Sequence, residues 1–178
     1  PTFAQATATL KILGGDADVD NDEFEFIELV NISDQTIDLS NVELKQIIVN
    51  AEEEGVNFVF GTGSIQQLAP NERLVVVEDL EAFQFRYGDQ LPVAGQWSGG
   101  LSNRGETITL AGESILQQFQ YADTWHEATD GQGPSLEIID ASNPNLDSWG
   151  QAAGWRASAL SGGSPGVAGT DVVIIGDS

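Results

Sequence analysis

A series of short apolar stretches constrains the fold more than any other feature of the sequence. The stretches cover residues 6–13, 24–31, 35–49, 56–60, 73–78, 106–112, 114–121 and 135–140. Several alternate apolar and polar residues with period two, which is typical of strands with one buried face. The run RLVVVE is continuously apolar instead, and this predicts a strand covered on both faces. Turn signals such as GTGS, LAPNE and SNRGE separate the stretches. Strands of this length and spacing predict an all-β fold, an antiparallel β-sandwich or barrel.

One short helix is predicted over residues 79–88. Asp79 is a suitable N-cap, the apolar residues that follow share one face at i, i+3 and i+7, and Gly88 can end the helix. Such a helix has about two turns. We expect it to plug one end of the sandwich.

The composition changes after residue 141, where Gly, Ser, Asn and Ala dominate. The bulky residues of this region are mainly Trp149 and Trp155. We therefore predict an extended strap over 141–166, pinned by the two tryptophans, within one domain that spans 1–166. Residues 167–178 contain the apolar run VVII, which predicts either a linker or an added edge strand.

The charge balance restricts the partners. The sequence contains 28 acidic and 6 basic side chains, which gives a formal net charge of −22. Nucleic-acid binding is excluded on this ground, because phosphate neutralisation needs clustered Lys and Arg. No apolar run approaches the roughly 18–20 residues of a transmembrane helix, so no membrane insertion is expected. The acidity itself fits divalent-cation binding, a salty medium, or solubility through self-repulsion.

The most acidic stretch, GGDADVDNDEFEF, allows two interpretations. An EF-hand loop counted from Asp16 needs Gly at position six and Glu at position twelve, but Asn21 and Ile27 stand there. Calcium requires only six to eight oxygens from a turning chain, and crowded carboxylates repel one another until a cation binds. The candidate calcium ligands are Asp16, Asp18, Asp20, Asp22 and Glu23. The other interpretation is a solvated hairpin tip.

The sequence contains no recognisable catalytic set. There is no Cys, which excludes thiolate catalysis and disulfides, and His126 is the only histidine. No G-x-S-x-G, P-loop or H-E-x-x-H motif occurs. Glu28 lies between Ile27 and Leu29 in an apolar stretch. We expect it to point to the outer face or to pair with a basic residue such as Arg104.

Aromatic residues suggest a second kind of site. The candidates for stacking on sugar rings are Trp97, Tyr121, Trp125, Trp149 and Trp155. Sugar binding would require them to form an exposed row, whereas a sandwich also uses such residues to fill its core. Trp125 is the best candidate ligand contact because polar residues flank it.

Three segments together resemble the lamin tail domain, the immunoglobulin-like module of nuclear lamins and of many exported bacterial proteins. These segments are EFIELVNISDQTIDLSNVELK (25–45), VNFVFGTGSIQQLAPNERLVVVED (56–79) and GQWSGGLSNRGETITLAGE (95–113). The last is the most specific, and the region 130–166 resembles the bacterial branch in particular. Two departures are the long acidic insert at 16–23 and Asn71, which replaces the usual turn glycine.

The resemblance implies an immunoglobulin-like β-sandwich used for attachment, with no catalytic residues. We therefore expect a non-enzymatic, secreted or cell-surface interaction module of a larger bacterial protein, with an unknown protein or cell-surface partner. The alternatives are a calcium-dependent or carbohydrate-binding module, or an accessory domain of a secreted hydrolase or nuclease. Nuclear lamins also contact DNA through this module, but we expect no such contact here because of the net charge of −22.

Overall fold

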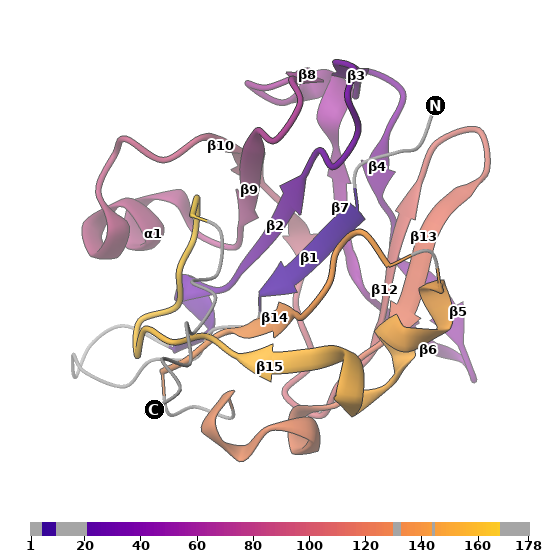
Figure 1. Cartoon of the computed structure of the whole chain (residues 1–178), viewed down its shortest axis with the longest axis vertical. Coiled ribbons are helices and arrows are strands. Elements are labelled where there is room, and N and C mark those ends of the chain that lie inside the picture. Colours follow the sequence, from indigo (N-terminus) through magenta and orange to yellow (C-terminus); the bar gives the residue numbers. More distant parts are fainter. Residues whose placement is uncertain (1–4, 10–20, 130–132, 144, 168–178) are drawn as a thin grey trace, which may run out of the picture.

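The alternating stretches form two main β-sheets that face each other in an immunoglobulin-like β-sandwich (Figure 1). The computed structural model describes residues 5–9, 21–129, 133–143 and 145–167. In this part of the chain, no helix is both long and apolar enough to span a bilayer.

The first sheet has the strand order β1-β2-β9-β10. Its strands are β1 (Gln5–Thr9), β2 (Phe26–Val30), β9 (Arg73–Val77) and β10 (Val93–Gln96). β2 pairs antiparallel with both β1 and β9, whereas β10 runs parallel to β9. The antiparallel prediction is therefore confirmed for all but one pair of this sheet.

The second sheet has the order β11-β7-β4-β12-β13, and every pairing in it is antiparallel. Its strands are β4 (Glu43–Leu44), β7 (Val56–Val59), β11 (Ser98–Gly99), β12 (Thr107–Ala111) and β13 (Ile115–Gln120). Three two-stranded sheets complete the fold: β3 (Ile37–Asp38) with β8 (Gln67–Leu68), β5 (Ile47–Val49) with β6 (Glu52–Glu54), and β14 (Leu136–Ile138) with β15 (Trp155–Ala157). The 3-10 turns are η1 (Asn21–Phe24), η2 (Phe60–Thr62), η3 (Asp123–Trp125), η4 (Glu127–Thr129), η5 (Leu146–Gly150) and η6 (Ala152–Gly154).

The pair β2–β9 is buried on both faces, as the continuous apolar run predicts. Side chains on its inner face join the main core, which includes Ile27, Leu29, Leu74, Val76, Leu44, Phe58, Ile108 and Leu110. On the outer face a second cluster contains Phe26, Val75, Val77 and Phe83. Because β9 presents valines on both faces, the outer face needs its own cover.

That cover is α1 (Leu80–Tyr87), the only α-helix in the described part of the chain. Its N-cap is Asp79, whose side chain accepts a hydrogen bond from the Ala82 N–H at 2.8 Å, and Gly88 ends it with a φ of +81°. The predicted helix and both of its caps are confirmed. Its predicted place was wrong, because α1 lies on the outer face of the first sheet instead of plugging an end of the sandwich (Figure 1).

The predicted strand over 35–49 is divided into β3, β4 and β5. The break between β3 and β4 lies at the DLSN segment, where the Ser40 N–H and hydroxyl donate to Asp38 Oδ1 at 2.9 and 2.5 Å. The Val42 N–H also donates to the Leu39 carbonyl at 2.9 Å. An aspartate that bonds to the backbone two residues ahead forms a turn in place of a strand ladder.

Asn71 adopts the left-handed conformation that the usual glycine would favour, with a φ of +63°. Asparagine tolerates this region better than other non-glycine residues because its short polar side chain bonds locally. The departure from the family pattern is therefore compatible with the fold.

Ala51 has a φ of +72° in the turn between β5 and β6, after Asn50 at +53°. Two positive φ values in a two-residue turn are typical of type I′, which favours Asn-Gly. Ala51→Gly is expected to raise the free energy of unfolding by about 0.5–1 kcal/mol, because relief of left-handed strain outweighs the added entropy of the unfolded chain. Urea denaturation measures the change.

Ala82→Gly is the matched control for this substitution. Ala82 lies in the first turn of α1 with helical φ, where glycine is less favourable than alanine by up to about 1 kcal/mol. A turn variant that is destabilised as much as the helix variant would show that Ala51 is not strained.

Candidate functional site

The acidic loop lies largely outside the part of the chain that the structure describes. The loop residues that fall outside it include Asp16, Asp18 and Asp20. Asp22 lies in η1 next to Glu23, whose side chain is exposed. Within the described residues, no group of three or more His, Cys, Asp or Glu side chains could hold a metal ion. The calcium site stays a prediction.

The aromatic candidates do not form an exposed row. Four of them are buried: Trp97, Tyr121, Trp149 and Trp155. Trp125 is half-buried at the end of η3, with its ring 6.2 Å from that of Trp155. The next residue, His126, places Nε2 3.2 Å from the Ala152 carbonyl oxygen, within reach of a hydrogen bond that ties this loop to the strap. Sugar binding therefore depends on Trp125 alone and stays a prediction.

Glu28 lies on the outer face of β2, but it is only 4% exposed. It forms a charge-assisted hydrogen bond with Arg73, not with Arg104, which is exposed in a loop. The register explains the partner, because Arg73 lies opposite Val30 on β9 and is thus the diagonal neighbour of Glu28 on the same face. The expected pairing with a basic residue holds, with a different partner from the one named.

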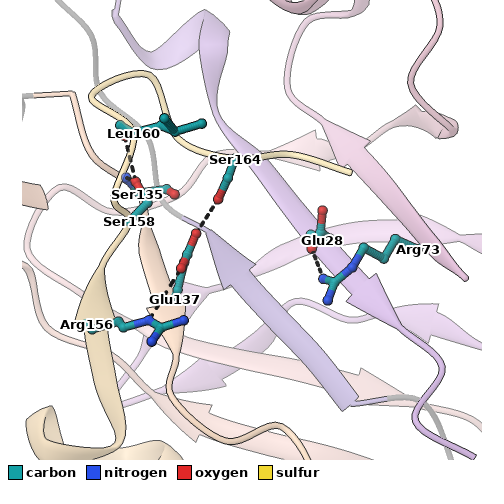
Figure 2. Close-up of polar contacts among 8 residues, drawn as sticks. All are labelled: Glu28, Arg73, Ser135, Glu137, Arg156, Ser158, Leu160 and Ser164. Atoms are coloured by element: carbon teal, nitrogen blue, oxygen red, sulfur yellow. Dashed lines mark hydrogen bonds and ion pairs between the residues drawn. The ribbon is translucent and has the colours of Figure 1, made fainter. Parts of the chain in front are cut away.

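Glu137 is a second buried carboxylate on the same side of the molecule, 7% exposed in β14 (Figure 2). Its Oε1 accepts a hydrogen bond from the Ser164 hydroxyl, and its Oε2 lies 3.6 Å from Arg156 Nε. Arg156 comes from β15, the strand that pairs with β14. Each of the two glutamates therefore has its own arginine from the neighbouring strand.

The end of the strap closes over this pair. The Gly166 N–H donates to Glu28 Oε2 at 2.5 Å, and the Tyr87 hydroxyl of α1 donates to the Gly162 carbonyl at 2.8 Å. At the start of this segment, Ser158 Oγ accepts from the Ser135 N–H at 2.9 Å and donates to the Leu160 carbonyl at 2.8 Å (Figure 2). The strap is thus bonded to β14, β2 and α1 by successive residues.

Burial raises the pKa of Glu28 above its ordinary value. The Gly166 N–H and Arg73 oppose this rise because they stabilise the carboxylate, whereas the negative charge of Glu137 adds to it. A buried carboxylate with a raised pKa beside a second carboxylate is a pattern found in acid–base catalysis. Here all four carboxylate oxygens of Glu28 and Glu137 already contact groups of the chain itself. The arrangement therefore fastens the strap and leaves no oxygen directed at a substrate.

Glu106 is the third buried carboxylate with a structural role. Its Oε2 accepts from the Gly55 N–H at 2.7 Å and its Oε1 from the Ser102 N–H at 3.0 Å. Burial raises the pKa of Glu106, and the nearby Glu54 carboxylate adds to the rise. The acidic residue of the GLSNRGETITL segment thus joins the loop before β12 to the residue after β6.

Sequence analysis did not single out Glu137, Ser164 or Gly166. The pattern around Glu137 contains the same signal as that around Glu28, since each is a glutamate between two large aliphatic residues of a strand. An ionisable residue at a buried position requires a partner. The signal therefore indicates burial and pairing, but it does not identify the partner, which lies far along the chain.

The comparison with protein families finds a match to the Lamin Tail Domain model over residues 4–151. A search of curated proteins found no match to the chain. The matched region includes both main sheets, and the strap residues 152–166 extend beyond it. Lamin tail domains are immunoglobulin-like interaction modules without enzymatic activity. The match covers most of the chain, which belongs to the lamin tail domain family.

Proposed function

We propose that this domain is a secreted or cell-surface attachment module of a larger bacterial protein. The proposal rests on a contrast between two groups of side chains, buried carboxylates that bond to the chain itself and apolar side chains that are exposed. The neighbouring carboxylates Glu28 and Glu137 are closed by the strap, while large apolar side chains on regular elements face solvent. Phe85 of α1 is 82% exposed and Ile48 of β5 is 65% exposed.

Binding residues are commonly held at the surface by a rigid scaffold, and the sandwich holds Phe85 and Ile48 at two separate places on its surface. A rigid presentation also limits the entropy lost on binding. The bacterial and extracellular setting is supported by the resemblance of the region 130–166 to bacterial members of the family. The high net negative charge is compatible with a salty medium outside the cell.

Protease treatment of intact cells tests this proposal. The parent protein is expected to be cleaved in intact cells of the source bacterium, while a cytoplasmic marker protein stays protected. Deletion of this domain is expected to release the parent protein into the culture medium. Protection of the parent protein in intact cells, together with its recovery in the soluble lysate, would refute the proposal.

A further inference from the structure

The β5–β6 ribbon, residues 47–54, is a two-stranded antiparallel sheet that pairs with no third strand in the described part of the chain. Its strands contact chiefly each other and lie at the periphery of the molecule (Figure 1). Val49 and Glu52 flank the two-residue turn, so they form the hydrogen-bonded closing pair. Alternation along an antiparallel pair then directs the backbone N–H and C=O of Ile48 away from β6. β5 thus presents an open hydrogen-bonding edge.

The base of the ribbon is fixed to the sandwich. The Gln46 N–H donates to Asn57 Oδ1 at 3.0 Å, and the Asn57 side-chain amide donates to Gln46 Oε1 at 2.9 Å. On the other strand, Glu54 Oε2 accepts from the Thr107 N–H of β12 at 2.8 Å. These bonds set the direction of the ribbon relative to the second sheet. A partner would therefore meet a pre-oriented edge, which lowers the entropy cost of binding.

The two strands of the ribbon differ in chemistry. β5 is Ile-Ile-Val with no charge, and β6 is three successive glutamates. Ile48 lies opposite Glu53, and both are exposed. Soluble proteins usually protect an exposed edge strand with charged residues, especially lysine. The nearest lysine, Lys45, pairs instead with Glu43 at 3.6 Å.

We propose that the open edge of β5 binds an extended, lysine- or arginine-containing segment of a partner protein as a third strand. The partner backbone would pair with the Ile48 N–H and C=O, which is β-strand addition. The aliphatic stems of the basic residues would cover Ile48, while their charged ends reach Glu53 on the next strand. This inference deepens the proposed function, on which it rests, by naming the interaction surface and the chemistry of the partner.

Charge complementarity favours this occupant over a second copy of the chain. Two copies that paired through their β5 edges would bring together two chains that each have a net charge of −22. Net charge of one sign opposes their association, and neither β5 offers a cation to the glutamates of the other ribbon. A basic segment relieves the repulsion among the glutamates of β6 and supplies the charge that the ribbon lacks.

A titration of the full chain with a capped peptide of alternating lysine and valine, followed by two-dimensional ¹H–¹⁵N NMR, tests the inference. We expect amide shifts confined to residues 47–54 and slower hydrogen exchange at the Ile48 amide on binding. The double variant Glu52→Gln with Glu53→Gln is expected to weaken binding about fivefold, as for loss of exposed ion pairs. Ile48→Ser is expected to weaken it as well, because a polar side chain leaves the stems uncovered. Core amide shifts report that each variant remains folded.

The matched control replaces exposed glutamates away from the ribbon, Glu81→Gln with Glu113→Gln, and should leave the affinity unchanged. Equal weakening by the control pair would mean that the peptide binds through the overall negative charge of the domain, and it would overturn the inference. Absence of exchange protection at Ile48, or dimerisation of the chain through the ribbon, would also overturn it. Loss of peptide binding with cell-surface exposure retained would refute the ribbon assignment and leave the proposed function standing.

Discussion

Arg73→Leu is expected to lower the free energy of unfolding by about 3–5 kcal/mol near neutral pH, the range measured when one partner of a buried ion pair is removed. The Arg73 side chain bonds to Glu28, which is buried between β9 and the end of the strap. Leucine fills part of the space but leaves the carboxylate without its cation. Chemical denaturation at constant pH measures the loss.

The size of this loss is expected to depend on pH. Glu28 has a raised pKa in the folded protein, and removal of Arg73 removes a group that lowers it. The unfolded pKa stays near 4.5. The penalty has its full size above the pKa that Glu28 has in the folded variant, where the carboxylate is charged and lacks its cation. It diminishes as the pH falls through this pKa toward that of the folded parent, because a protonated Glu28 no longer needs Arg73. The other carboxylates titrate in both proteins, so their contribution cancels when the free energy of unfolding of the parent is subtracted from that of the variant.

Two controls separate the ion pair from loss of charge in general. Arg104→Leu removes an exposed arginine and is expected to change the free energy of unfolding by no more than about 0.5 kcal/mol. Glu28→Gln in the Arg73→Leu background removes the buried charge, so it should recover stability at neutral pH and abolish the pH-dependent difference. A loss for Arg104→Leu as large as for Arg73→Leu would contradict the structural assignment.

The partner of Glu28 shows where sequence reasoning stops. Its position in an apolar strand predicts that a basic residue pairs with it, but the sequence alone does not show which of the six basic residues does so. The choice depends on the register between β2 and β9, which brings together residues 45 positions apart. The contact with Gly166 spans 138 positions and needs the path of the strap as well. Periodicity is local information and does not contain either of these pairings.

Sequence patterns predict those features that depend only on residues nearby in the chain. The cap residues of α1 and the apolar run of β9 could be predicted because capping and face coverage depend on nearby residues. The Asp38–Ser40 turn was also local, but the long alternating pattern around it obscured the turn signal. The position of α1 could not be predicted, since it depends on which face of the distant β2–β9 pair lacks a cover.

Trp155→Ala is expected to destabilise the domain by about 3–5 kcal/mol, the usual cost of removing a buried tryptophan. Trp155 is 1% exposed, and its ring centroid lies 5.2 Å from that of Phe119 and 5.5 Å from that of Trp149. Its Nε1–H also donates to the Trp149 carbonyl at 2.7 Å. Alanine leaves a cavity between β13 and the strap and an acceptor without its donor. Urea denaturation measures the loss, with Leu160→Ala on the exposed part of the strap as the control.

Hydrogen exchange distinguishes two ways in which this loss could arise. If the strap is fastened independently by Glu28 and Glu137, the Gly166 and Ser158 amides should stay protected in Trp155→Ala while the whole domain loses stability. If Trp155 is the anchor on which those bonds depend, both amides should exchange faster before global unfolding. We expect the second result, because β15 begins at Trp155 and contributes Arg156, the partner of Glu137. A variant with unchanged stability and unchanged exchange would contradict the packing of this tryptophan in the core.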